Sequence, residues 1–405
     1  MTKTVLVVGT FDTKGEEYKF CIDLIEGRGL NTITMNAGIM GEPSFTPDIS
    51  AKDVAVAGGT TLQALRDGND RGTAVVAMSQ GAAKLAADLV AEGKIDGAFS
   101  MGGTGGSSLA AAVYKDLPVG MPKVLISTAA SGNVAPYVGV KDVTMMYSIV
   151  DVAGLNSISR QIFTNGAAAI SGMVEQAAPA AGDDKPLITA SMYGVTTPCV
   201  TRVRENLEEA GYEVLVFHAV GSGGRSMEAL IQGGYIKGVA DITTHELIDD
   251  LVEGIHGAGP DRMLAAAQTG TPQIVSLGAL DMGTYGPVET VPAIYKDRKL
   301  HVHNASITIM ESSADERVAS AKLMVEKLNQ ATGPTTLFIP LKGTSMMDNE
   351  EMPFHSPEAR EAMFNVVREG IDKSKVEIVE LDLHINDPAF ADAMSERLMA
   401  SMNGS

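Results

Sequence analysis

The sequence has no tryptophan, only two cysteines and few aromatic residues, which make up 5% of its 405 residues. Cys21 and Cys199 lie far apart and lack the spacing of a disulfide framework, so we expect a reduced, cytoplasmic protein. Basic residues are also scarce, since 31 Lys and Arg stand against 50 Asp and Glu and give a net charge of −19. Because nucleic-acid binders neutralise phosphates with clustered Lys and Arg, this composition argues against a nucleic-acid partner.

Long hydrophobic runs are missing as well. The apolar run that begins at Val5 ends before Gly9, which is too short for the core of a signal peptide. No stretch approaches the roughly 18 consecutive apolar residues of a membrane span, so we expect no membrane association. The hydrophobic fraction of 45% and the charged fraction of 20% instead predict a folded globular chain.

The sequence does contain a regular alternation of β-branched apolar runs and helical segments. A strand at 4–8 is followed by a helix for which Thr13 and Glu16 have capping-box spacing, and a second strand is expected at 31–35. Parallel strands need crossovers of this length, which places helices on the faces of a parallel sheet. The pattern predicts an α/β fold with two Rossmann-like, doubly wound parallel-sheet domains in tandem.

A boundary between the two domains is expected near residue 182. The stretch 177–186 is small, polar and contains proline, as linkers do, and the strand–helix alternation restarts at Leu187. We therefore expect a nucleotide-binding domain at 1–181 and a second Rossmann-like domain at 182–405. Further strands of the second domain are expected at 273–277, 307–310, 336–339 and 376–381.

The strongest local motif is a glycine-rich loop between an expected strand and a helix. It consists of Gly102, Gly103, Thr104, Gly105, Gly106 and Ser107. Backbone N–H groups at a helix N-terminus and the helix dipole attract phosphate, and a serine hydroxyl adds a donor. The loop matches neither a Walker A motif nor G-x-G-x-x-G. The alternative interpretation is a tight turn in which several glycines adopt positive φ.

A second motif, Asp12, Thr13 and Lys14, follows the first strand. Ligands of open parallel sheets bind at the carboxyl ends of the strands, so this loop and the glycine-rich loop are expected to face one crevice. Asp12 can hold a Mg²⁺ water or a ribose hydroxyl, while Thr13 and Lys14 can meet phosphate oxygens. The alternative is that Asp12 and Thr13 only cap the helix. For Ser50, at a helix start, a structural role is favoured.

All seven histidines lie in the second half of the chain. His301 and His303 are two residues apart in an expected strand, would share one face and could bind a metal, with Asp281 or Glu246 as carboxylate partners. Paired histidines on a strand are more often structural, so no metal site is predicted.

Two further polar loops follow expected strands. The segment 221–226 includes Arg225, which can clamp a carboxylate or phosphate, and 342–345 is another strand-end loop. Together they predict a pocket for a small anionic metabolite that faces a cleft between the domains.

Four motifs together suggest a family: Val8–Lys14, Met101–Ser108, Gly278–Met282 and Ile339–Gly343. The chain resembles, along nearly its whole length, the ATP-binding inhibitory domain of the tomato mosaic virus resistance protein and its bacterial and fungal relatives. The resemblance implies ATP with Mg²⁺ in the first domain and a homodimer. It also implies ATP contacts from Asp12, Thr13 and Lys14 and from Gly103 to Gly106, whereas Ser50 matches only approximately.

Three functions remain open at this point, one of which is a regulatory binding module whose ATP occupancy controls assembly without turnover. The leading hypothesis is an ATP-binding protein of uncertain activity whose first domain holds the nucleotide. The alternative is a hydrolase or lyase that acts on a small acid or sugar acid, with His218, His245, His301 or His303 as acid/base groups or metal ligands. The sequence does not decide whether the protein is an enzyme.

Overall fold

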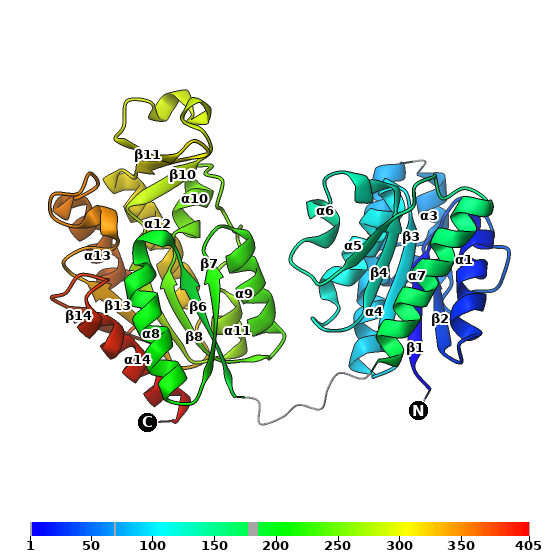
Figure 1. The fold of residues 1–405 in the computed structure, drawn as a ribbon, viewed down its shortest axis with the longest axis horizontal. Coiled ribbons are helices and arrows are strands. Elements are labelled where there is room, and N and C mark those ends of the chain that lie inside the picture. Colours follow the sequence, from blue (N-terminus) through cyan, green and yellow to red (C-terminus); the bar gives the residue numbers. More distant parts are fainter. Residues whose placement is uncertain (1, 69, 177–184, 405) are drawn as a thin grey trace. The chain divides into compact units, whose positions relative to one another are not determined.

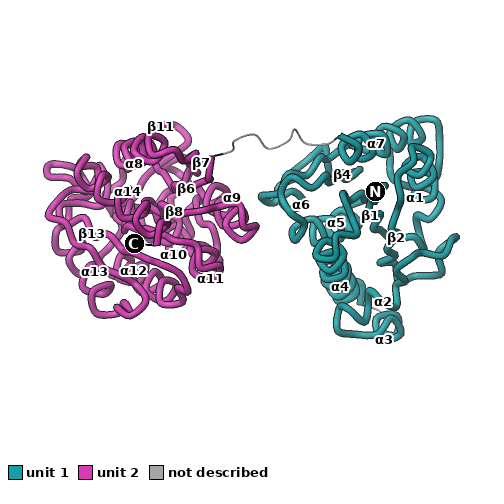
Figure 2. Tube along the Cα trace, turned by 90° about the horizontal axis from the view of Figure 1, so that it is seen from below, with its two compact units in different colours: residues 1–180 teal, residues 181–405 magenta. Residues whose placement is uncertain are grey.

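The computed structural model describes residues 2–68, 70–176 and 185–404 (Figure 1). The chain divides into two compact units, residues 1–180 and 181–405 (Figure 2). Each unit has its own sheet and its own hydrophobic core. The boundary expected between residues 181 and 182 lies outside the described residues.

Unit 1 alternates strands and helices as the sequence pattern predicts. Its elements are β1 (Thr4–Gly9), α1 (Phe11–Glu26), β2 (Asn31–Asn36), α2 (Ala51–Ala57), α3 (Leu62–Asp67), α4 (Arg71–Ala91), β3 (Gly97–Gly102), α5 (Thr104–Asp116), β4 (Lys123–Ser127), η1 (Thr128–Ser131), α6 (Ala135–Val138), β5 (Thr144–Tyr147) and α7 (Ser157–Glu175). The five strands are all parallel and are ordered β2-β1-β3-β4-β5.

The alternation of side chains along β1 explains the three layers of unit 1. Leu6 and Val8 pack into a cluster with α2, α4 and α5, whereas Val5 and Val7 pack against α1 and α7 on the other face. Both faces of the sheet are therefore covered, as a parallel sheet requires. Figure 1 shows α1 and α7 together on one side of this sheet.

Helix α4 has the length and the mean hydropathy, 1.3, of a membrane span. Its residues Ala74, Met78, Ala82 and Ala86 recur at helical spacing and are buried in the core cluster with α5. Arg71, which begins the helix, is exposed. We interpret α4 as a core helix with one exposed face, since 39% of its apolar window is buried.

Unit 2 repeats the same architecture and adds a small second sheet. Its elements are β6 (Leu187–Met192), η2 (Gly194–Thr196), α8 (Thr197–Glu209), β7 (Glu213–His218), α9 (Ser222–Gln232), β8 (Ile236–Thr243), α10 (Glu246–Leu251), α11 (Ala265–Thr269), β9 (Gln273–Gly278), β10 (Met282–Tyr285), η3 (Val288–Thr290), η4 (Ala293–Tyr295), β11 (Leu300–Asn304), β12 (Ile307–Glu311), α12 (Ala314–Leu328), β13 (Thr335–Pro340), η5 (Met346–Asp348), α13 (Pro357–Gly370), β14 (Val376–Leu381) and α14 (Pro388–Met402). Six parallel strands are ordered β14-β13-β9-β8-β6-β7.

Helices cover both faces of the six-stranded sheet. Helices α8 and α14 pack on one face, and α9, α11, α12 and α13 pack on the other. The predicted fold class of two Rossmann-like parallel-sheet units is confirmed.

The additional sheet is antiparallel, in the order β10-β12-β11. The strand expected at 307–310 exists as β12, but it belongs to this sheet and not to the parallel one. Strand β8, which lies in the middle of the large sheet, was not expected from the sequence. Its polar residues Lys237 and Asp241 interrupt the apolar run by which strands are recognised.

Candidate functional site

The loops after β1 and β3 lie at the switch point of the first sheet. Strand β1 pairs with β2 on one side and with β3 on the other. The chain leaves β1 into α1 on one face and leaves β3 into α5 on the opposite face. In open α/β sheets, ligands bind outside the carboxyl ends of the strands at such a point of divergence.

The glycine-rich loop presents an uncapped helix N-terminus at this switch point. Helix α5 begins at Thr104 after Gly103, and no side chain caps its N-terminus. A Cβ atom built on Gly103 or Gly105 would meet nothing closer than 3.7 Å, at Thr128 and Arg71 respectively. The backbone N–H groups of the first helical turn can therefore be approached closely by a ligand.

The other two glycines of the loop serve packing. A Cβ on Gly102 would lie 3.1 Å from the Cα of Gly106, and one on Gly106 would lie 3.2 Å from the Met101 carbonyl oxygen. None of the four glycines from 102 to 106 has a positive φ. The alternative interpretation of this loop as a turn that needs positive φ is therefore wrong.

Ser107 is turned inward and does not offer a free hydroxyl. It is buried, its hydroxyl donates to the Gly103 carbonyl at 2.9 Å, and it lies 2.6 Å from the Ser127 hydroxyl. Ser107 therefore fixes the glycine-rich loop to the end of β4.

Asp12 holds a neighbouring loop and keeps one oxygen unused. Its Oδ2 accepts hydrogen bonds from the backbone N–H groups of Met40 (2.6 Å) and Gly41 (3.3 Å). Its Oδ1 is buried and has no hydrogen-bond partner among the described residues. A buried carboxylate oxygen without a partner is costly, so this atom is suited to a ligand or cation.

The start of α1 differs from the sequence prediction. The helix begins at Phe11 after Thr10 with no side-chain cap of its own, so the expected capping box of Thr13 and Glu16 is wrong. The physical reason is non-local: Asn36, at the end of β2, accepts the Phe11 N–H at 3.0 Å.

Lys14 and Thr13 both have hydrogen-bond partners within unit 1. The Lys14 ammonium donates to the Val152 carbonyl, and the Thr13 hydroxyl lies 3.2 Å from that of Thr10.

The positive charge beside the glycine-rich loop comes instead from Arg71, whose Nη2 lies 3.7 Å from the Cβ position of Gly105. Arg71 could not be predicted from the sequence, because only the packing of α4 against α5 brings it there. Ser50 caps α2 through a capping box with Asp53, the structural role expected.

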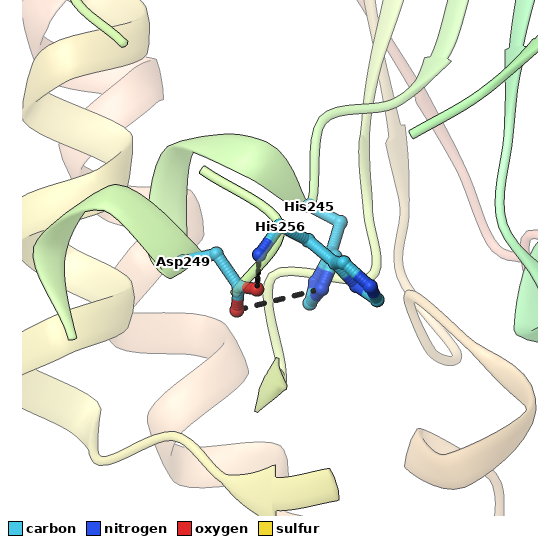
Figure 3. A group of neighbouring side chains, drawn as sticks. All are labelled: His245, Asp249 and His256. Atoms are coloured by element: carbon cyan, nitrogen blue, oxygen red, sulfur yellow. Dashed lines mark hydrogen bonds and ion pairs between the residues drawn. The ribbon is translucent and has the colours of Figure 1, made fainter. Parts of the chain in front are cut away.

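A second cluster of polar side chains lies at the switch point of the other sheet, between β6 and β8. Tyr193 follows β6, and His245 follows β8 at the start of α10. Asp249 lies one turn further along, and His256 follows in the next loop (Figure 3). His245 and Asp249 are fully buried, and His256 is half-buried.

Hydrogen bonds fix the orientation of these groups. His245 Nδ1 lies 3.1 Å from the Ala279 carbonyl oxygen, and its Nε2 lies 3.0 Å from the Thr284 hydroxyl. Asp249 accepts the N–H of Thr284 at 2.8 Å and that of His256 at 2.9 Å. The Tyr193 ring stacks on His245 with ring centroids 4.6 Å apart.

Burial dominates the electrostatics of the cluster. It lowers the pKa of His245 to about 4 and that of His256 to about 4. Burial also raises the pKa of Asp249 to about 7. Both imidazoles are therefore neutral at pH 7. Asp249 is buried, and it pairs with no Lys or Arg among the described residues.

The candidate histidines of the sequence analysis separate into two groups. His245 lies in the cluster, and the His218 ring is 5.4 Å from the Tyr193 ring. His301 and His303 are exposed on β11 and do not belong to the cluster. Asp249 and His256 were missed, although the four-residue spacing of His245 and Asp249 on a helix was a usable signal.

The loop 221–226 does not offer the anion site that its glycines suggest. The carboxylate of Glu246 accepts the N–H groups of Gly221 (2.7 Å) and Gly224 (3.1 Å) at the start of α9. This helix N-terminus therefore already binds an internal anion. Glu246 in turn accepts from Arg262 Nε, so it is not a partner of a histidine metal site.

The loop 342–345 is also engaged within unit 2. Thr344 and Ser345 donate to the buried carboxylate of Asp281 at 3.2 and 2.7 Å, and Thr344 also donates to Asp348. Burial and the neighbouring Asp348 charge raise the pKa of Asp281 to about 6. The expected pocket for a small anion stays a prediction.

The raised pKa of Asp281 predicts a pH dependence of stability. Unfolded aspartate loses its proton near pH 4, whereas folded Asp281 keeps it to about pH 6. This group thus stabilises the fold below pH 4, and that contribution is lost as the pH rises to 6. Asp281→Asn should gain stability relative to wild type over this range, by on the order of 2–3 kcal/mol. Denaturant unfolding at pH 4, 5 and 6 measures the difference, and a constant difference would refute the assignment.

Comparison with known proteins agrees with this architecture. The N-terminal domain of the uncharacterised protein family UPF0261 matches residues 3–179, and its C-terminal domain matches residues 185–402. A UPF0261 protein of Clostridium tetani is 48% identical over 99% of this chain and all of the relative. The ToMV resistance protein Tm-1 of Solanum lycopersicum is 33% identical over 98% of this chain and 55% of its own length.

A solved structure that aligns with nearly the whole chain is only distantly similar. The UDP-GlcNAc 2-epimerase of Methanocaldococcus jannaschii aligns over 98% of this chain and 93% of its own, with 10% identity and a TM-score of 0.23, which supports no argument about function. The family models and the relatives confirm the resemblance found from the sequence motifs. The chain belongs to the uncharacterised protein family UPF0261.

Proposed function

We propose that unit 1 binds a nucleoside triphosphate, ATP with Mg²⁺, at the carboxyl ends of β1 and β3. The observation that carries the proposal is the uncapped N-terminus of α5, which begins beyond the open positions of Gly103 and Gly105. Free N–H groups, the helix dipole and the absence of side chains together make a phosphate cradle. The resemblance to an ATP-binding domain points to the same loop.

Two charged side chains support this assignment. Arg71 lies beside Gly105 and forms no ion pair among the described residues, so its guanidinium can donate to phosphate oxygens. The unpartnered Oδ1 of Asp12 fits Mg²⁺ or a water bound to it, since Mg²⁺ is usually held by one or two carboxylates and by substrate phosphates. Lys14 would have to leave the Val152 carbonyl to reach a phosphate.

Calorimetric titration of the full chain tests the proposal directly. We expect saturable ATP binding that is stronger with Mg²⁺ than without it, and stronger than binding of NAD or inorganic phosphate. If ATP binds no better than either control, the glycine-rich loop holds a different ligand and the proposal fails.

Replacing Arg71 should weaken nucleotide binding. A hydrogen bond to a charged group contributes about 1.5–3 kcal/mol, so Arg71→Ala should raise the Kd for ATP by about 10- to 150-fold. Arg28→Ala is the matched control, because Arg28 is an exposed arginine that pairs with Glu175 beyond the other end of α1. Equal affinities of the two variants would remove Arg71 from the site.

The remaining expectations are open to simple tests. A homodimer is expected from the resemblance, and light scattering with and without ATP measures it. A cytoplasmic location stays a prediction.

The alternative of a hydrolase or lyase now depends on His218 and His245, which lie in the unit 2 cluster, and no longer on the exposed His301 and His303.

A further inference from the structure

We propose that His245, Asp249 and His256 form a binding site for a divalent transition metal such as Zn²⁺, at the switch point of the unit 2 sheet. The site is separate from the nucleotide site proposed for unit 1. Each residue offers one ligand atom, and these atoms all lie within 4.8 Å of one another. Within the described residues, this is the one group of three or more His, Cys, Asp or Glu ligands that is so close.

The separation of the ligand atoms is close to what an ion needs. Bonds of about 2.0–2.2 Å from Zn²⁺ to nitrogen and oxygen in a tetrahedron place ligand atoms roughly 3.3–3.5 Å apart. His245 Nε2 and Asp249 Oδ1 are already 3.5 Å apart. A small movement of the half-buried His256 ring closes the set, because the rest of the group is held by the core.

The hydrogen bonds select the correct nitrogen of His245. The Ala279 carbonyl accepts from Nδ1, and this places the proton there and leaves the lone pair of Nε2 facing Asp249. Metal-ligating histidines typically donate their second nitrogen to a carbonyl or carboxylate in this way. Ala279 has a φ of 59°, an uncommon conformation for a residue with a side chain, and this orients its carbonyl.

The turn between Asp249 and His256 is built around the carboxylate. Asp249 accepts the His256 N–H, and a Cβ on Gly254 would lie 2.5 Å from the Asp249 carboxyl carbon. Only glycine fits against the carboxylate at this point. The turn thus returns His256 to the side of Asp249.

Asp249 differs from three other buried carboxylates of unit 2 in the groups that surround it. Asp241, Glu246 and Asp348 each contact a guanidinium group. Among the described residues, Asp249 hydrogen-bonds or pairs with imidazole and backbone N–H groups and with no guanidinium. A divalent cation held together with the two imidazoles would compensate the charge of the ionised carboxylate.

The neighbouring hydroxyl groups permit an open coordination position. Thr284, now 3.0 Å from His245 Nε2, also lies 3.2 Å from the Tyr193 hydroxyl. When Nε2 binds a metal, the Thr284 hydroxyl can turn its hydrogen bond toward Tyr193. Three protein ligands with a water in the fourth position are the pattern of catalytic zinc sites.

The test is calorimetric titration of ZnCl₂ into chelator-treated, nucleotide-free full-length protein, together with Co²⁺ absorption spectroscopy. We expect the protein to bind one equivalent of Zn²⁺ tightly. With Co²⁺, we expect visible absorption bands typical of a four-coordinate ion. His256→Gln should weaken binding at least about 10-fold, because even residues that only orient metal ligands contribute 10- to 100-fold. His256 is half-buried, so the variant should keep the wild-type circular dichroism spectrum.

His301→Gln is the matched control, since it changes an exposed histidine outside the cluster. It should bind Zn²⁺ as wild type does. No saturable binding to wild type, or binding that persists in His256→Gln, would overturn the proposal and leave the cluster as a set of structural hydrogen bonds. The variant Asp249→Asn is a second test. It should lack the visible absorption of bound Co²⁺ even if it keeps some affinity for Zn²⁺.

Discussion

Replacing Arg262 with methionine should destabilise unit 2 by about 3–5 kcal/mol, the range for breaking a buried ion pair on one side. Arg262 is fully buried, and its guanidinium donates to both oxygens of Asp241 at 2.6 Å. It also contacts Glu246 at 2.5 Å and Glu228 at 3.2 Å. Methionine would leave three carboxylates in the core without their shared counter-charge.

The loss should extend to the start of α9 and to the loop before α11. Glu246 also binds the start of α9, and Glu228 accepts the backbone N–H groups of Met263 and Ala265. With roughly 2–4 °C per kcal/mol for a domain of this size, the unfolding temperature of unit 2 should fall by about 6–20 °C. Hydrogen exchange of peptides from each unit measures how much protection, and so how much stability, each unit loses.

Arg225→Met is the matched control for Arg262→Met. Arg225 is exposed on α9, so its replacement should change the free energy of unfolding by no more than about 0.5 kcal/mol. If the two variants unfold alike, or if unit 1 peptides lose as much protection as those of unit 2, the buried ion cluster does not stabilise unit 2 as described.

The same cluster shows which parts of the fold can be predicted from sequence. Strands such as β1 and β13 contain uninterrupted apolar runs, and their pattern is sufficient to recognise them. Strand β8 is not, because Asp241 lies within it and is neutralised by Arg262, which is 21 residues away. A local sequence pattern cannot predict a strand whose buried charge is neutralised only by a residue that folding brings to it.

The candidate sites divide in the same way. The position of the glycine-rich loop follows from local sequence, because a strand, glycines and a helix start occur in order. The directions of side chains do not follow: Lys14 donates to Val152, which is 138 residues away, and Arg71 reaches Gly105 only through helix packing. In unit 2, His256 is placed by a turn around Asp249, so spacing alone could not assign it.

Gly105→Glu should abolish nucleotide binding without harming the fold. A Cβ at Gly105 meets only Arg71, at 3.7 Å, and the residue lies in the first turn of α5. A carboxylate there would occupy the N–H groups and pair with Arg71. Two like charges 4 Å apart near a protein surface repel by about 4 kcal/mol, so the Kd for ATP should rise at least about 100-fold.

The stability of the same variant should move in the opposite direction. A negative charge at a helix N-terminus contributes about 0.3–1 kcal/mol, and replacing a helical glycine adds a similar amount. Gly172→Glu is the matched control, because Gly172 lies in α7 and has nothing within 4 Å of its Cβ position. We expect Gly172→Glu to bind ATP as wild type does. Because Gly105→Glu is expected to be at least as stable as wild type, its loss of ATP affinity could not be attributed to unfolding, whereas an unchanged Kd would exclude the N-terminus of α5 as the phosphate site.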